Sequence, residues 1–233
     1  MIVNGVNIIN KYGLVLLEKK IQANKIISYV EWLENSKTPL KLKPEKAEFS
    51  SIFVKLLVEG ENEGTVLLKI SNIINDCKSG IVKFDDINFA YKFTIENHNS
   101  ERIVDEAYNL TLTLKSDYKI IDQAIETINR VTSKTINVVG NQETPCIIEI
   151  TPSISLVDLI ITGLEDGPIT IKNLTAGKKV IINGEDGTVL ENGINKFGDT
   201  ELWEWPRLLP GSNTITVSKN SCDITIKYKP RYI

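Results

Sequence analysis

The chain has 233 residues, 42% of them hydrophobic and 24% charged, which is ordinary for a globular protein of one or two domains. Lysine and arginine number 27 against 30 acidic residues, and a net charge of −3 favours neither nucleic acid nor an anionic membrane as a partner. We find no secretion signal and no apolar run long enough to span a bilayer, so we expect folding in the cytoplasm.

In the first part of the chain, residues 52–58 and 65–70 are apolar and β-prone. The segment between them, 60–64, is rich in turn-forming residues, so the pattern predicts a hairpin. Ser71 is a suitable N-cap for a short helix that would reach about Cys77.

A change of hydrophobic period follows further along the chain. Residues 108–115 alternate apolar and polar side chains, which predicts a strand with one buried and one wet face. Beyond it, apolar residues recur every three or four positions and predict an amphipathic helix over about 118–132. The residues of this helical pattern are Ile121, Ala124, Ile125, Ile128 and Val131.

A run of turn formers with a proline, residues 139–145, suggests a boundary between two domains. We therefore expect a first domain over 1–136, a linker over 137–145 and a second domain over 146–233. The second domain carries short β-branched segments at regular spacing, which favours an antiparallel β-sandwich. Its predicted strands are 146–150, 156–162, 169–174, 179–183, 188–190 and a closing hairpin of 214–218 and 222–228 turned through 219–221.

The three cysteines, Cys77, Cys146 and Cys222, are far apart and have apolar neighbours. They show neither CxxC nor Cys/His ligand spacing, so we interpret them as reduced core cysteines and predict no metal site.

Residues for catalysis are scarce. The one histidine, His98, lies in a polar run typical of a solvated loop, which leaves a serine or cysteine nucleophile without a general base. Phosphate-binding glycine motifs are absent from the sequence. We predict no catalytic residue, no cofactor and no enzymatic activity. Four adjacent acidic pairs remain candidates for glycoside hydrolysis: 85–86, 105–106, 165–166 and 185–186. Three of the four lie in turn-like contexts, and we interpret all of them as solvated surface residues.

Trp203 and Trp205 are the candidate binding residues. Exposed indole rings can stack on sugars, whereas a tryptophan before a proline turn can equally pack between sheets. In an extended segment, alternate residues face the same side, so the two rings would share one environment. Packing is the favoured reading, and carbohydrate contact is the alternative.

The end of the chain carries a family resemblance. It reads WPRLLPGSNTITVS over residues 205–218 and SCDITIKYKPRYI over residues 221–233. This ending resembles that of siphophage distal tail proteins, in which an aromatic residue with Pro precedes a PG-N-ITV strand and the last strand closes in Y-PR. The counterparts here are Trp205-Pro206, residues 210–217 and residues 228–231.

Other segments extend this resemblance. Residues 140–148 are similar to the GN-x-E-x-P passage that opens the family's second domain, and residues 169–174 to its ITI-N strand. The N-terminal half matches more loosely, through Asn4-Gly5 and the strand at 108–115.

The resemblance implies a mostly β fold with minor α structure. The N-terminal domain would be a β-sandwich or barrel-like domain with one or two helices that forms a hexameric ring, followed by a galectin-like antiparallel β-sandwich. It also implies a structural role in the virion tail, with the tail tube protein, a tail-associated tip protein and possible receptor-binding proteins as partners. Two alternatives stay open: a carbohydrate-binding β-sandwich module, or a baseplate subunit of a contractile tail or phage-derived bacteriocin.

Overall fold

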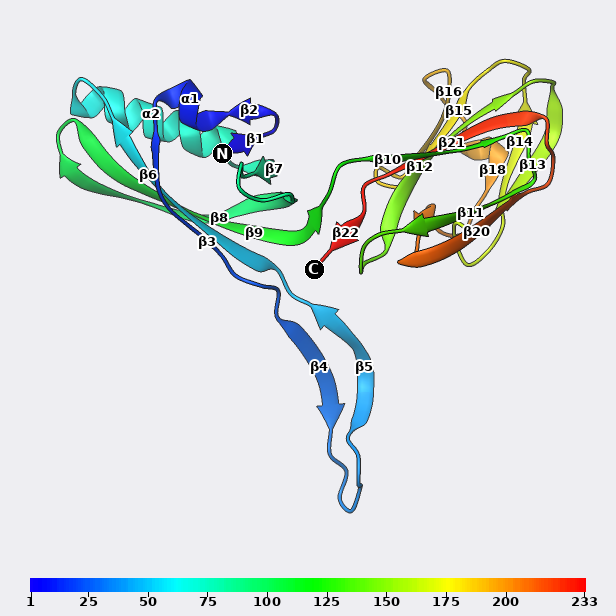
Figure 1. Ribbon diagram of the computed structural model, residues 1–233, viewed down its shortest axis with the longest axis horizontal. Helices are drawn as coiled ribbons and strands as arrows, with labels where there is room; N and C mark the ends of the chain where they lie inside the picture. The colour runs from blue at the N-terminus through cyan, green and yellow to red at the C-terminus, as the bar shows by residue number, and fades with distance from the viewer. The chain divides into compact units, whose positions relative to one another are not determined.

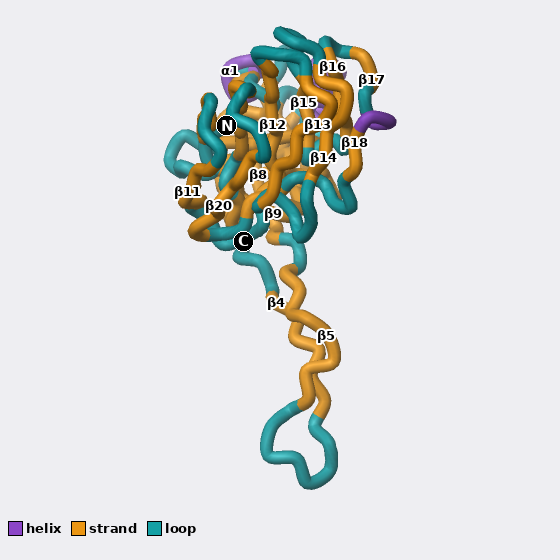
Figure 2. Tube along the Cα trace, turned by 90° about the vertical axis from the view of Figure 1, so that its right-hand side faces the viewer, coloured by secondary structure: helices purple, strands orange, loops and turns teal.

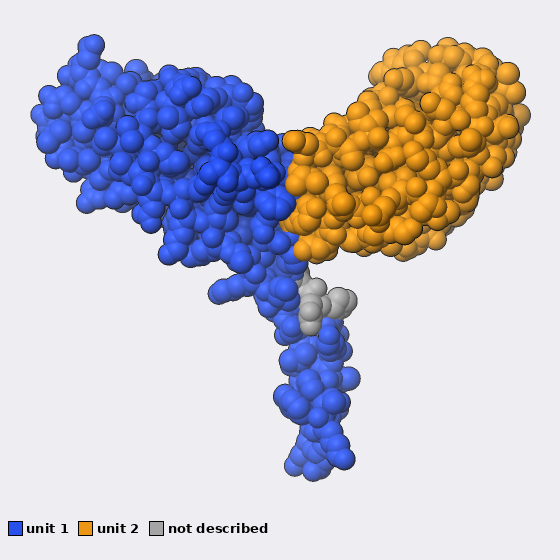
Figure 3. Space-filling view, viewed as in Figure 1, with its two compact units in different colours: residues 1–120, 233 blue, residues 121–232 orange. Residues whose placement is uncertain are grey.

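The computed structural model describes residues 1–233, with side chains for all but residues 44–46, and is mostly β with two short α-helical elements (Figure 1). The chain forms two compact units, coloured separately in Figure 3: unit 1 is Met1–Ile120 with Ile233, and unit 2 is Ile121–Tyr232. None of the described helices is both long and apolar enough to cross a membrane. The predicted fold class is confirmed, although none of the sheets formed by the described residues closes into a barrel.

Unit 1 is built on an antiparallel sheet with one buried face. The alternation predicted for 108–115 is confirmed, because every second side chain from Tyr108 to Leu114 is buried. These side chains lie opposite Ile52, Val54, Leu56 and Val58 of the neighbouring strand, so both strands contribute to one core. The strands of unit 1 in this sheet are β1 (Ile2–Val3), β2 (Val6–Asn7), β3 (Val15–Ile21), β6 (Ser50–Glu59), β7 (Ser79–Lys83), β8 (Ala90–Val104) and β9 (Ala107–Ile120), in the order β2-β1-β7-β8-β9-β6-β3.

The helices α1 (Ile8–Tyr12) and α2 (Glu63–Asp76) pack against the buried face of this sheet (Figure 1). The predicted hairpin of 52–58 with 65–70 is therefore wrong. The helix predicted from Ser71 to about Cys77 is confirmed in type and in its end, but it begins at Glu63. The side chain of Asn62 caps α2 by accepting the backbone N–H of Thr65 at 3.0 Å. Val66, Ile70 and Ile73 fall on one helical face and are buried, whereas Leu67 and Leu68 are exposed. Burial at spacings of four and three residues follows the period of a helix, whereas a strand buries every second residue.

A two-stranded arm extends from the β3–β6 end of the sheet (Figures 1 and 2). It consists of β4 (Ile26–Glu31) and β5 (Leu40–Ala47), which pair only with each other in the described structure. At its base the Glu48 N–H donates to the Lys25 carbonyl at 2.7 Å. We call residues 26–47 the arm.

Unit 2 is an antiparallel structure of two sheets around a shared core of mainly Ile, Val and Leu. The strands predicted within 146–190 are confirmed. The first sheet contains β10 (Ala124–Asn129), β21 (Cys222–Tyr228), β12 (Thr144–Pro152), β15 (Val180–Asn183), β16 (Thr188–Glu191) and β17 (Ile194–Asn195) in that order, with β19 (Arg207–Leu208) paired to β12. The second contains β11 (Ser133–Val138), β20 (Gly211–Val217), β13 (Leu156–Thr162), β14 (Ile169–Leu174) and β18 (Thr200–Glu201) in that order. A 3-10 turn, η1 (Phe197–Asp199), precedes β18. The last strand of the chain is β22 (Arg231–Tyr232).

The helix predicted over 118–132 is wrong. Residues 118–120 complete β9, and residues 124–129 form β10, which pairs along its whole length with β21. Of the apolar residues in the helical pattern, Ile128 is fully buried, but Ile125 and Val131 are exposed. The three- and four-residue spacing does not mark a buried face, and pairing with a partner remote in the sequence determines the structure.

The boundary between the units also differs from the predicted linker at 137–145. The units divide after Ile120, so β10 and β11 belong to unit 2, where each pairs over six residues with a C-terminal strand. The turn formers at 139–143 connect two strands inside unit 2, and their N–H groups at Asn141 and Gln142 donate to the Arg231 carbonyl.

The closing strands are confirmed, but the hairpin between them is wrong. β20 pairs with β11 and β13, whereas β21 pairs with β10 and β12. Residues 218–221 therefore carry the chain from one sheet to the other, so that alternate apolar residues of both strands enter the same core.

A glutamate links three strands of the first sheet of unit 2. The Glu149 side chain, 17% exposed, accepts from Lys227 Nζ at 2.6 Å and from Lys179 Nζ at 3.0 Å. The hydrogen bond from Lys227 and then that from Lys179 lower the pKa of Glu149.

Because the folded-state pKa is lowered, Glu149 stabilises the protein at neutral pH, and this stabilisation is lost as the pH falls through that pKa. We expect Glu149→Gln to cost about 1 kcal/mol at pH 7 and to flatten the decline in the free energy of unfolding below about pH 4.3. Urea unfolding at pH 7 and pH 3.5 checks this. Glu201→Gln, at an exposed ion pair in the same unit, is the control. An unchanged pH dependence in Glu149→Gln would contradict the prediction.

Candidate functional site

The segment that carries both candidate tryptophans is an irregular stretch between β18 and β19. It lies along the loop at 163–167, because the Glu204 N–H donates to Glu165 Oε2 at 2.7 Å and the Arg207 N–H donates to the Leu164 carbonyl at 2.7 Å. These two hydrogen bonds fix the segment against the loop that connects β13 and β14.

The two tryptophans have different environments. Trp203 is 93% exposed, and its ring lies beside Gly167. Trp205 is partly buried: its ring packs on the core of unit 2, approaches Gly187, and lies 5.8 Å from the Phe197 ring. The prediction that both rings share one environment is wrong, because the chain is not an extended strand here. Trp205 has a packing role, and Trp203 stands free at the surface.

Carboxylates surround one guanidinium next to Trp203. Arg207 Nε lies 3.3 Å from Glu143, an Arg207 Nη lies 3.4 Å from Asp166, and Arg207 also pairs with Glu204. These three carboxylates raise the pKa of Arg207, the hydrogen bond to Glu204 contributing most. Burial raises the pKa of the nearby Glu165, whose Oε1 is buried without a hydrogen-bond partner. Four acidic side chains thus share one arginine.

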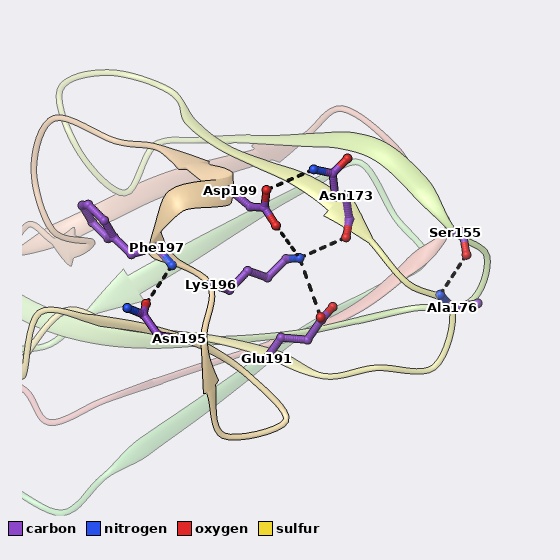
Figure 4. A network of polar contacts seen from close by, with 8 residues as sticks. All are labelled: Ser155, Asn173, Ala176, Glu191, Asn195, Lys196, Phe197 and Asp199. Carbon is purple, nitrogen blue, oxygen red and sulfur yellow. Dashed lines mark hydrogen bonds and ion pairs between the residues drawn. The ribbon is translucent and has the colours of Figure 1, made fainter.

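A buried lysine supports the neighbouring turn (Figure 4). Lys196 Nζ donates to the Asn173 carbonyl and to Asp199 Oδ2, each at 3.0 Å, and lies 3.7 Å from Glu191. Its hydrogen bond lowers the pKa of Asp199, and Asn173 adds to the effect. The network holds η1 and with it Phe197, the residue against which Trp205 packs.

We expect Lys196→Met to reduce the free energy of unfolding by about 2–3 kcal/mol, because Glu191 would remain largely buried without its cation. Chemical denaturation followed by tryptophan fluorescence measures this. The matched control is Lys172→Met, which removes an exposed pair with Glu201 and should change stability by about 0.5 kcal/mol or less. Equal effects of the two substitutions would contradict a structural role for the buried network.

Of the other residues considered for chemistry, Glu165 and Asp166 contact this segment directly. His98 is exposed as predicted, but it lies in β8 opposite Leu112 and not in a loop. All four acidic pairs fall in turns or bends, one more than the three predicted. At least one member of each contacts a cation: Asp85 with the N-terminal ammonium group, Asp86 with Lys19, Asp105 with Arg102, Asp166 with Arg207 and Glu185 with Arg231.

The cysteines are buried and free, which confirms their prediction as reduced core residues. Burial raises the pKa of Cys77 and of Cys146 to about 12, so both are thiols at neutral pH. The described residues contain no group of three or more His, Cys, Asp or Glu arranged to hold a metal ion.

The arm is a surface that the sequence analysis missed. Its apolar side chains are exposed to an extent unusual for a folded domain, and they lie along both strands and at the tip. They are Ile26, Tyr29, Val30, Trp32, Leu33, Leu40 and Leu42, with exposed fractions between 38% and 65%. A hollow of about 810 Å³ at the base of the arm is lined by Ile27, Tyr29 and Phe49 among others.

Comparison with known proteins gives concordant results. Residues 139–232 match the family model of the siphovirus-type tail component, C-terminal domain. The crystal structure of phage SPP1 Dit, described as a hub adsorption apparatus of phages that infect Gram-positive bacteria, matches with a TM-score of 0.78 and 12% identity over 100% of this chain and 98% of that one. Two structures of the phage P2 baseplate in its activated conformation, with Ca and with Sr, match with TM-scores of 0.55 and 12% identity, covering 92% of this chain and 90% of theirs. No curated protein matches.

The chain has the fold of a phage tail hub protein over its whole length, and residues 139–232 match the C-terminal domain of a siphovirus-type tail component. The resemblance to siphophage distal tail proteins is thus confirmed in sequence over residues 139–232 and in fold over the whole chain. The proteins to which this chain is similar are components of phage tails.

Proposed function

We propose that six copies of this chain form a ring through unit 1, and that the ring joins the distal end of the tail tube to the tail tip. The partners are the tail tube protein on one side, and a tail-associated tip protein and receptor-binding proteins on the other. In this proposal unit 2 is a galectin-like sandwich that offers its surface to those proteins, and the chain has no catalytic activity.

The observation that carries the ring proposal is the exposed apolar surface of the arm. A two-stranded hairpin is marginally stable in water by itself, and the arm pairs with no other strand of its own chain among those described. Tryptophan and tyrosine side chains such as Trp32 and Tyr29 are enriched in protein interfaces. Contact with a neighbouring copy would cover these side chains and stabilise the arm.

The edge of the unit 1 sheet next to the arm supports the same proposal. β3 is an edge strand, and Val15, Leu16 and Leu17 on it are exposed. An uncovered apolar edge is an association site. An arm and an edge are different surfaces, so a contact between them is heterologous, and such contacts close into a ring when the rotation per subunit divides the circle.

The absence of catalysis is proposed from the acidic pairs and the histidine. The acidic pairs occupy turns and contact cations, and His98 is exposed on β8 whereas the three cysteines are buried. These contacts give the acidic residues a structural role that requires no substrate.

Negative-stain microscopy of the purified full chain tests the proposed assembly. Class averages should show closed rings with six-fold symmetry and a central opening. Open filaments or particles without rotational symmetry would contradict a closed ring, since a heterologous contact that fails to close gives filaments.

A further inference from the structure

Trp203 is an aromatic surface residue that the fold does not need. Its side chain is 93% exposed, whereas Trp205, two residues away, packs on the core. A fully exposed tryptophan exposes a large apolar area to water, which is unfavourable unless a partner covers it. Tryptophan is also among the residues that most often dominate binding energy at interfaces.

The surroundings of Trp203 carry excess negative charge. Glu143, Asp166 and Glu204 pair with the single Arg207, and Glu165 lies beside them with one oxygen buried and unpartnered. The exposed fractions of the Asp166 and Glu143 side chains are 87% and 63%, so these carboxylates remain accessible to a second cation. We call Trp203 with these four acidic residues the acidic tryptophan site.

An indole face attracts a cation through its quadrupole, and adjacent carboxylates attract the same cation by charge. The two features together select lysine or arginine side chains, and the apolar area of the ring selects an apolar neighbour. An anionic glycan would be repelled by the same carboxylates. A single protruding ring, with Trp205 packed away from it, also differs from the concave sites in which small ligands are held.

We infer that the acidic tryptophan site docks a segment of another tail protein that presents a lysine or arginine beside an apolar side chain. The naming of a tail protein as the partner rests on the proposed function; the chemistry of the segment does not.

The test uses the full chain and a fluorescein-labelled peptide of alternating lysine and leucine, with anisotropy measured at low salt. A second peptide has glutamine in place of every lysine. We expect Trp203→Ala to weaken binding of the lysine peptide about tenfold or more. Asp166→Asn should weaken it by a smaller factor, and the glutamine peptide should bind at least tenfold more weakly than the lysine peptide. Binding should also weaken as salt is added.

Val157→Ala is the matched control, because Val157 is 80% exposed on the same unit and lies on β13, away from Arg207 and its carboxylates in the sequence. It should leave the affinity unchanged. The inference is overturned if Trp203→Ala binds the lysine peptide as well as wild type, or if the glutamine peptide binds equally well. It is also overturned if a neutral N-acetylglucosamine oligomer quenches the fluorescence of Trp203 while the lysine peptide does not bind. Anisotropy reports binding per chain, so the result is independent of whether the chain forms a ring.

Discussion

A variant without the arm should remain monomeric under conditions in which the full chain forms a ring. Lys25 and Glu48 already pair at the base of the arm, so an Asn-Gly turn can replace residues 26–47 between them. The variant loses the exposed apolar side chains that we assign to the contact with a neighbouring copy. Because these side chains are exposed in the single chain, their removal should change the free energy of unfolding of unit 1 by about 1 kcal/mol or less.

Sedimentation velocity of the variant and the full chain at equal concentration measures the expected loss of assembly. A control variant changes exposed apolar residues of unit 2, Val157→Ser with Ile194→Ser, and should assemble as the full chain does. If the shortened chain forms the same oligomer, the arm is not the element that joins the copies.

Gly163→Ala should be among the most destabilising single substitutions in unit 2. Gly163 follows β13 with φ of +86°, a conformation that is strained for alanine, and a Cβ there would overlap the carbonyl oxygen of Thr214. The backbone at Thr214 cannot move away without disturbing β20, which pairs with β13 and β11. We expect a loss of about 3 kcal/mol or more in the free energy of unfolding.

The control for this substitution is Gly177→Ala. Gly177 also has positive φ, +72°, but a Cβ there meets nothing within 4 Å, so conformational strain acts without a collision. Its expected cost is about 1 kcal/mol. Equal costs at the two glycines, measured by urea denaturation, would show that the approach of Thr214 has no energetic consequence.

The sequence predicted the strands best where one face is buried and the other is wet. β9 has five buried side chains in alternation, from Tyr108 to Ser116, and β12 and β21 repeat the pattern in unit 2. In such strands apolar residues recur at every second position, and so do buried residues. The strand can therefore be predicted without knowing which other strands pair with it. Of the C-terminal motifs that carry the family resemblance, the segment at 210–217 lies almost entirely on β20, whose burial also alternates, and the motif at 228–231 begins at the last residue of β21.

The secondary-structure predictions were wrong where the spacing of the apolar residues differs from the spacing of the buried residues. In α2 the exposed Leu67 and Leu68 hid the helical face of Val66, Ile70 and Ile73 by turning it into a continuous apolar run. In β10 the exposed Ile125 completed a helical pattern that the structure does not use. Both cases depend on which side chains meet the core, and that is set by strands remote in the sequence.

The arm and the environment of Trp203 could not be predicted for a related reason. Leu40 and Leu42 alternate with lysines as in a half-buried strand, yet both are exposed. Trp203 and Trp205 differ because the chain between β18 and β19 is irregular, and the alternation rule holds only in a strand. An exposed apolar surface has the same sequence pattern as a buried one, and only the three-dimensional structure distinguishes the two.

The mass of the full chain in solution, measured by light scattering at several concentrations, tests the proposed assembly most directly. One chain has a mass of 26.1 kDa, and the account predicts a stable species of six times that mass that persists on dilution. A species of 26.1 kDa at every concentration would contradict the proposal that this protein forms a ring by itself.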